Sequence, residues 1–118
     1  MVVCALSQAP AEIQQALEEP CCTVVRIDGS LFFGACESVA RQLESHDRPN
    51  LVVLAAGINF IDLSGLHLLQ GQARRCQARG GRLYLVWTKP DVMARLQRAG
   101  LVDGDNARNH DKPMAITI

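Results

Sequence analysis

One short segment, NFIDLSGL at residues 59–66, stands where a buried strand is expected to give way to a helix. Unpaired backbone N–H groups and the helix dipole favour negative charge at such a helix start. Asp62 and Ser64 both carry side chains that can cap a helix, and capping is the simpler interpretation. The alternative is that Ser64, in an exposed turn with Leu63 and Gly65, receives a phosphate or contacts a partner. The carboxylate of Asp62 would partly repel an added phosphate, which suits a switch.

Four arginines form a second candidate site towards the C-terminal end of the same expected helix. Positive charges at this end complement the helix dipole, so a solvated polar face is one interpretation. The other is a docking patch for an acidic partner or a membrane surface. The set consists of Arg74, Arg75, Arg79 and Arg82.

The remaining reactive side chains do not assemble into a catalytic or metal site. The sequence has neither a GxxxxGK[ST] phosphate loop nor a GxGxxG fingerprint. Cys21 and Cys22 are adjacent, which is poor spacing for two ligands of one zinc ion, and no CxxC occurs. Cys36 and Cys76 fall on the inner stripes of expected helices, and the three histidines show no pairing with a nucleophile. We therefore expect no enzymatic activity, no metal and no cofactor.

Composition indicates one folded domain and argues against nucleic acid as a partner and against a membrane-spanning segment. The chain has 118 residues, 48% hydrophobic and 20% charged, with no net charge. A protein that binds nucleic acid by electrostatics normally carries a basic excess, so nucleic acid is not expected as a partner. The longest apolar stretch, residues 51–61, is shorter than the ~20 residues of a membrane-spanning helix. The N-terminus lacks the basic residues of a secretory signal, and five cysteines fit a reducing compartment, which predicts a cytoplasmic domain.

Hydrophobic patterning predicts strands that alternate with helices, hence an α/β domain. The run LVVLAA at residues 51–56 is apolar without alternation, which is typical of a central parallel strand covered on both faces. Thr88 and Asp91 resemble a capping box before the last helix. The expected strands are 23–27, 31–33, 51–56, 82–87 and an edge strand at 114–118. The expected helices run from Pro10 to Pro20, from Gly34 to Pro49, from residues 62–65 to Gly80, and from Pro90 to Gly100.

The segment FIDLSGLHLL at residues 60–69 resembles the signature of STAS domains, which are shared by sulfate transporters and anti-sigma-factor antagonists. VVRIDGSLFFGA at 24–35 resembles the first hairpin and helix start of that family, and residues 79–101 resemble its later strand and helix. The resemblance covers residues 23–102 of a single domain spanning 1–118, with 1–20 and 103–118 outside the recognisable core. It implies a mostly parallel sheet of four or five strands, with helices packed mainly on one face.

Within the family, LFFG at residues 31–34 resembles the SulP anion-transporter branch. This implies a cytoplasmic regulatory domain of a sulfate or anion transporter, whose partner is a protein or the membrane domain of the parent transporter. The alternative is a free-standing anti-sigma-factor antagonist, in which the serine matching Ser64 is phosphorylated by a partner kinase. Some members are said to bind nucleotide weakly. The chain departs from the family at Leu63, a position commonly small or hydroxylated, and in the tail 107–118, which lacks the usual amphipathic final helix.

Overall fold

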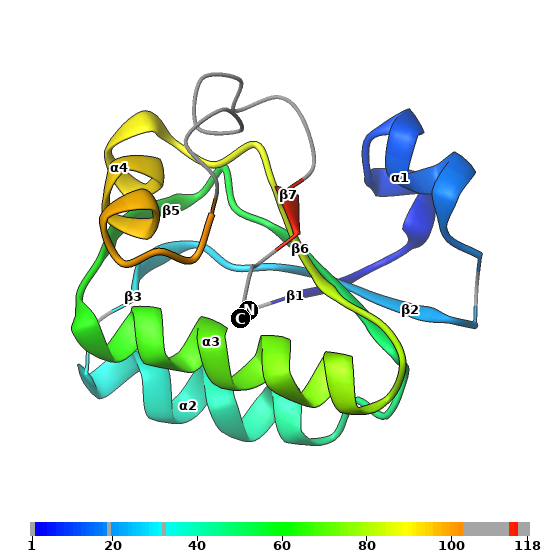
Figure 1. Cartoon of the computed structure of the whole chain (residues 1–118), viewed down its shortest axis with the longest axis horizontal. Helices are drawn as coiled ribbons and strands as arrows, with labels where there is room; N and C mark the ends of the chain where they lie inside the picture. Colours follow the sequence, from blue (N-terminus) through cyan, green and yellow to red (C-terminus); the bar gives the residue numbers. More distant parts are fainter. Residues whose placement is uncertain (1, 19, 32, 103–113, 116–118) are drawn as a thin grey trace.

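The main sheet has five strands, and its centre is parallel. The structure, a computed structural model, describes residues 2–18, 20–31, 33–102 and 114–115. Parallel pairs join the three middle strands, and antiparallel pairs join each edge strand (Figure 1). The α/β class agrees with the expectation, but the sheet is mixed rather than mostly parallel. In spatial order the strands are β1 (Val2–Cys4), β2 (Cys22–Arg26), β4 (Asn50–Leu54), β6 (Leu83–Val86) and β7 (Met114–Ala115).

The continuous apolar run of β4 is buried on both faces, as the sequence predicts. Every residue from Leu51 to Ala55 is buried, and β4 lies in the middle of the sheet order. Because side chains alternate along a strand, Leu51 and Val53 face one layer while Val52 and Leu54 face the other. The prediction of a central strand here is confirmed.

Helices cover the two faces unequally (Figure 1). Three helices pack into the larger core: α2 (Phe33–Glu44), α3 (Leu63–Ala78) and α4 (Pro90–Arg98). The short η1 (Leu6–Gln8) and α1 (Ala11–Ala16) cover the opposite face, where Ile13 is buried. The expected inner stripes are confirmed, since the buried helix residues include Cys36, Val39, Leu43, Leu69, Ala73 and Cys76.

The expected hairpin after the first core strand is wrong. β3 (Gly29–Leu31) pairs in parallel with β5 (Ile58–Ile61), and together they form a separate two-stranded sheet. Gly29 has φ of 94°, a conformation that favours glycine, and its N–H donates to the carbonyl of Gly57 at 2.8 Å. A Cβ at Gly57 would displace the exposed carboxylate of Asp28 and would lie 3.2 Å from the Asp28 Cα, so the two segments approach closely here. The chain therefore turns away from β2 instead of folding back along it.

The structure also differs from the sequence expectations at the start of α4 and in the last edge strand. The capping box of Thr88 and Asp91 is wrong, because the N-cap of α4 is Lys89, with no side-chain cap, and Thr88 is buried. Pro90 disfavours helical backbone in the residue before it, so the helix begins after the position that the box would need. The edge strand expected at 114–118 appears as β7 at its first two residues. The remainder of that strand and residues 103–113 lie outside the described residues.

Candidate functional site

The first turn of α3 is capped by Asp62. β5 ends at the buried Ile61, and Asp62 then adopts extended backbone (φ −103°, ψ −172°). Its side chain accepts a hydrogen bond from the backbone N–H of Gly65 at 3.0 Å. Ser64 is the second helical residue, and no hydrogen bond of its hydroxyl is found within the part of the chain that the structure describes. Of the two side chains that the sequence offers as caps, Asp62 therefore acts as the cap.

Ser64 lies on the wall of a groove between α2 and α3. The two helices run side by side along one face of the molecule (Figure 1). The groove between them is shallow and open to solvent, and its exposed lining is more apolar than polar. Ser64 is half-buried there, whereas the neighbouring Leu63 is 66% exposed. The residues that line the α2–α3 groove are Cys36, Glu37, Ala40, Ser64, His67 and Leu68.

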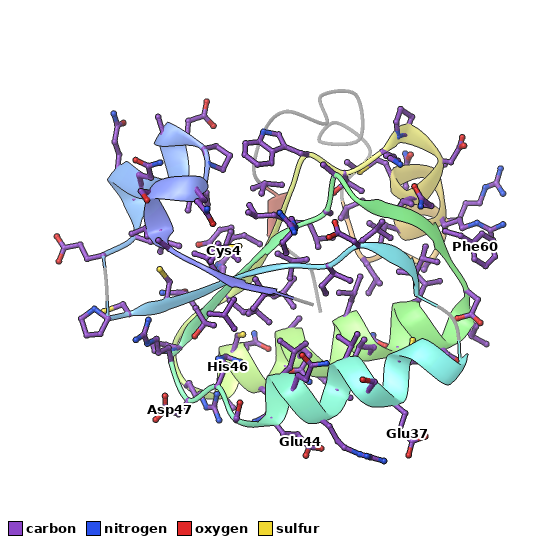
Figure 2. All side chains as sticks on the ribbon, turned by 180° about the vertical axis from the view of Figure 1, so that it is seen from behind. Cys4, Glu37, Glu44, His46, Asp47 and Phe60 are labelled. Atoms are coloured by element: carbon purple, nitrogen blue, oxygen red, sulfur yellow. The ribbon has the colours of Figure 1, made fainter. Side chains whose placement is uncertain are left out.

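One acidic residue, Glu37, lines this groove, and Asp62 lies close enough to act on Cys36. Burial, and then the nearby charge of Asp62, raises the pKa of the Cys36 thiol, so it stays protonated near neutral pH. Glu37, on the outer side of α2 (Figure 2), pairs with Arg41 at 3.0 Å in an exposed i,i+4 ion pair. The Cys36 thiol, which lines the groove, is therefore not activated as a thiolate nucleophile.

The four predicted arginines do not form one free patch. Arg79 donates to the carbonyl of His46 at 2.9 Å, and Arg75 donates to the carbonyl of Glu44 at 3.4 Å. These carbonyls lie at and just beyond the end of α2, where helices leave acceptors unpaired, so both arginines help to join the two helices. Arg74 and Arg82 are exposed. About 22 Å of helix separates Ser64 from Arg79, so the two candidate sites are distinct.

Sequence reasoning missed the setting of His46. The side chain is only 8% exposed, and within the described residues neither ring nitrogen has a hydrogen-bond partner. Burial first, and then the positive charges of Arg79 and Arg75, holds its pKa below the usual value, while Asp47 acts in the opposite direction. The sequence carries no signal for this, because the burial comes from the packing of the α2–β4 loop.

Sequence reasoning also missed β5, and with it the exposed Phe60. An alternation of apolar and polar residues would have marked a strand, but Asn59 and Phe60 are both exposed between two buried residues. The one available signal was an aromatic residue, Phe60, two positions before Asp62 of the Asp-x-Ser-Gly segment. Within the described ranges, no group of three or more His, Cys, Asp or Glu residues is arranged to hold a metal ion.

Comparison with protein-family models decides the family. The model described as STAS domain matches residues 11–110, which is most of the chain. The chain belongs to the STAS domain family. The match agrees with the sequence resemblance and extends it at both ends. STAS domains are generally non-catalytic regulatory domains that mediate protein interactions.

Three solved structures with the same fold come from two kinds of protein. The anti-sigma factor antagonist SpoIIAA in its unphosphorylated form is 21% identical, covers 84% of this STAS domain and 79% of that chain, and has a TM-score of 0.63. A sulfate transporter family protein from Wolinella succinogenes is also 21% identical and has a TM-score of 0.63. The match covers 81% of this chain and 75% of that chain. The SulP transporter STAS domain from Vibrio cholerae is 22% identical and has a TM-score of 0.56. The match covers 76% of this chain and 72% of that chain. At these identities the likeness shows the fold alone.

Comparison with curated proteins gives no significant match. In the part of the STAS domain that the structure describes, no helix is long and apolar enough to cross a membrane.

Proposed function

We propose that this STAS domain is a non-catalytic, cytoplasmic regulatory module that binds a protein partner at the α2–α3 groove, with Ser64 as its switch. The observation that carries the proposal is the division of roles at the start of α3. Asp62 makes the capping hydrogen bond to Gly65, and the Ser64 side chain lies on the groove wall beside the exposed Leu63. A hydroxyl that does not cap the helix is available for modification or recognition.

A phosphate on Ser64 would change the surface more than the fold. The N-terminus of a helix favours negative charge, so the helix itself would tolerate the group. The phosphate would add about two negative charges near Asp62, while the charge of Glu37 is already paired with Arg41, and a partner that buries the groove would have to desolvate the phosphate. Phosphorylation is therefore expected to weaken a partner that covers this turn.

The proposed setting is a SulP-type anion transporter, in which this module would bind the membrane domain or a regulator of transport. The apolar LFFG sequence at residues 31–34, which resembles the SulP branch, supports this setting. The structural neighbours described as transporter proteins are consistent with it.

The second candidate is a free-standing anti-sigma-factor antagonist controlled by a serine kinase. The position of Ser64 on the groove wall favours it, and the SpoIIAA structure shares the fold. Neither setting requires a cofactor or a chemical step on this chain.

The test compares four forms of the purified domain: native, Ser64→Ala, Ser64→Asp and Ser7→Asp. Ser7 is exposed in η1 on the opposite face, so its variant matches the added charge away from the groove. Each form is titrated by calorimetry against a SulP membrane domain and against an anti-sigma kinase from the same organism, and Ser64 phosphorylation with ATP is followed by mass spectrometry. Ser64→Asp should weaken binding by about tenfold or more, whereas Ser7→Asp should bind as the native form does.

Binding to the membrane domain without phosphorylation would identify the transporter setting. Phosphorylation of Ser64 by the kinase would identify the antagonist. Equal binding by all four forms would overturn the role of Ser64.

A further inference from the structure

A second groove lies between β5 and α4, lined on its β5 side by Asn59, Phe60 and Ile61. Its volume is about 310 Å³, at the lower end of the range for ligand sites. Figure 2 shows Phe60 beside α4, at the end of the molecule away from His46 and Glu44. The β5–α4 groove is therefore distinct from the place where Arg75 and Arg79 join α3 to the end of α2.

Phe60 and Arg95 form a prepared aromatic and cationic surface. Phe60 is 41% exposed, so its ring presents an apolar face to solvent at the edge of the groove. The guanidinium carbon of Arg95 lies 4.8 Å from the centroid of this ring, within the range of a cation–π contact. The stacked guanidinium is held in place, while its N–H groups stay available to an acceptor. Beside them Lys89 donates to the side-chain carbonyl of Asn59, which fixes a second connection between α4 and β5.

The groove carries an excess of positive charge. Arg95 and Arg98 are three residues apart on α4, and both line the groove. Within the described residues neither arginine takes part in an ion pair. Asp91 is the one acidic residue of the lining, so the two arginines outnumber it. Because the whole chain has no net charge, this excess is local.

We propose that the β5–α4 groove docks an acidic segment of a protein partner, with carboxylates held by Arg95 and Arg98 and an apolar side chain against Phe60. Charge complementarity favours an acidic occupant, and guanidinium groups bind carboxylates in a planar, two-point geometry. The apolar part of the wall, from Phe60, Val92 and Ala94, favours a peptide over a small inorganic anion. Aromatic and arginine side chains are also the usual energetic centres of protein interfaces.

The probe is a fluorescein-labelled peptide of sequence EEFLEE, and its lysine counterpart KKFLKK serves as the charge control. Binding to the full chain is measured by fluorescence anisotropy, and the contacted residues are mapped from amide chemical shifts. We expect EEFLEE to shift the amides of Asn59, Phe60, Arg95 and Arg98, and KKFLKK not to bind. The double variant Arg95→Glu/Arg98→Glu should weaken binding at least about tenfold, and Phe60→Ala should weaken it while the fold is retained by circular dichroism.

The matched control is Arg74→Glu/Arg82→Glu, which makes the same change of charge at two exposed arginines outside the groove. This variant should bind EEFLEE as the native chain does. Equal losses in the two double variants, or no binding of EEFLEE to the native chain, would overturn the proposal. Displacement of EEFLEE by millimolar inorganic phosphate, with shifts at the same amides, would also overturn it, because the groove would then be a phosphate site.

Discussion

Asp62→Ala removes the side-chain acceptor that the Gly65 N–H uses at the start of α3. The hydrogen bond is 3.0 Å long, its acceptor is a carboxylate, and Asp62 is half-buried, so water replaces it only in part. Loss of an N-cap of this kind costs about 0.5–2 kcal/mol, and the charge and partial burial place Asp62→Ala in the upper half of that range. For a domain of this size, a loss of about 1–2 kcal/mol lowers the melting temperature by roughly 3–10 °C.

Ser64→Ala should behave differently, although serine is an equally good capping residue by type. Its hydroxyl has no hydrogen bond within the described residues, so the free energy of unfolding should change by less than about 0.5 kcal/mol. Asp62→Asn is the matched control, because asparagine keeps an acceptor and caps nearly as well as aspartate. Urea titrations followed by circular dichroism give the free energies, and equal m-values check that the unfolding transition is unchanged. A loss for Ser64→Ala as large as that for Asp62→Ala would refute the assignment of the cap.

Two further predictions concern the pH dependence and the glycines. Because burial and neighbouring arginines depress the pKa of His46, the unfolded state takes up its proton first. The free energy of unfolding should therefore decrease as the pH falls below about 6.5, which is the pKa of histidine in an unfolded chain. Urea titrations at pH 7.5 and 5.5 should show a smaller loss in His46→Gln than in the native chain or in His67→Gln, and equal losses would contradict this origin. Gly71→Ala, in open space within α3, should stabilise the domain by about 0.5–1 kcal/mol. Gly81→Ala should destabilise it, since the added Cβ would collide with the carbonyl of Pro49, and the reverse order of melting temperatures would contradict the packing of this turn.

The elements that were predictable from the sequence are those defined by local patterning. The unbroken apolar run of β4 required burial on both faces, and the stripes of α2 and α3 required a common core. The outcome of the β3 region depended instead on a distant partner. The segment after Gly29 suits a hairpin by its local signals, but it pairs with β5, whose residues lie about 30 positions further along the chain. Pairing between such distant segments leaves no periodic trace in either one.

The candidate site divides in the same way. Residue types identified the start of α3, since Asp62 and Ser64 both have side chains suited to a helix N-terminus. Which of them caps depends on backbone angles, and the extended conformation of Asp62 decides it. The arginines show the opposite case, because helix position alone suggested a free basic face. Arg75 and Arg79 are engaged by carbonyls from the α2–β4 region, and that contact exists only after the two helices pack.

The two ends of α3 are held by different contacts, and this difference bears on how Ser64 would act. At the C-terminal end, Arg75 and Arg79 bind carbonyls at and beyond the end of α2, and Gly81 packs closely against Pro49. At the N-terminal end, the carboxylate of Asp62 accepts a hydrogen bond from the Gly65 N–H and caps the helix. A charge placed at position 64 therefore lies at the helix N-terminus, where the helix dipole favours negative charge, while the far end stays anchored. Its effect should remain local to the groove, which is why partner binding, and not the melting transition, is the measurement that reports it.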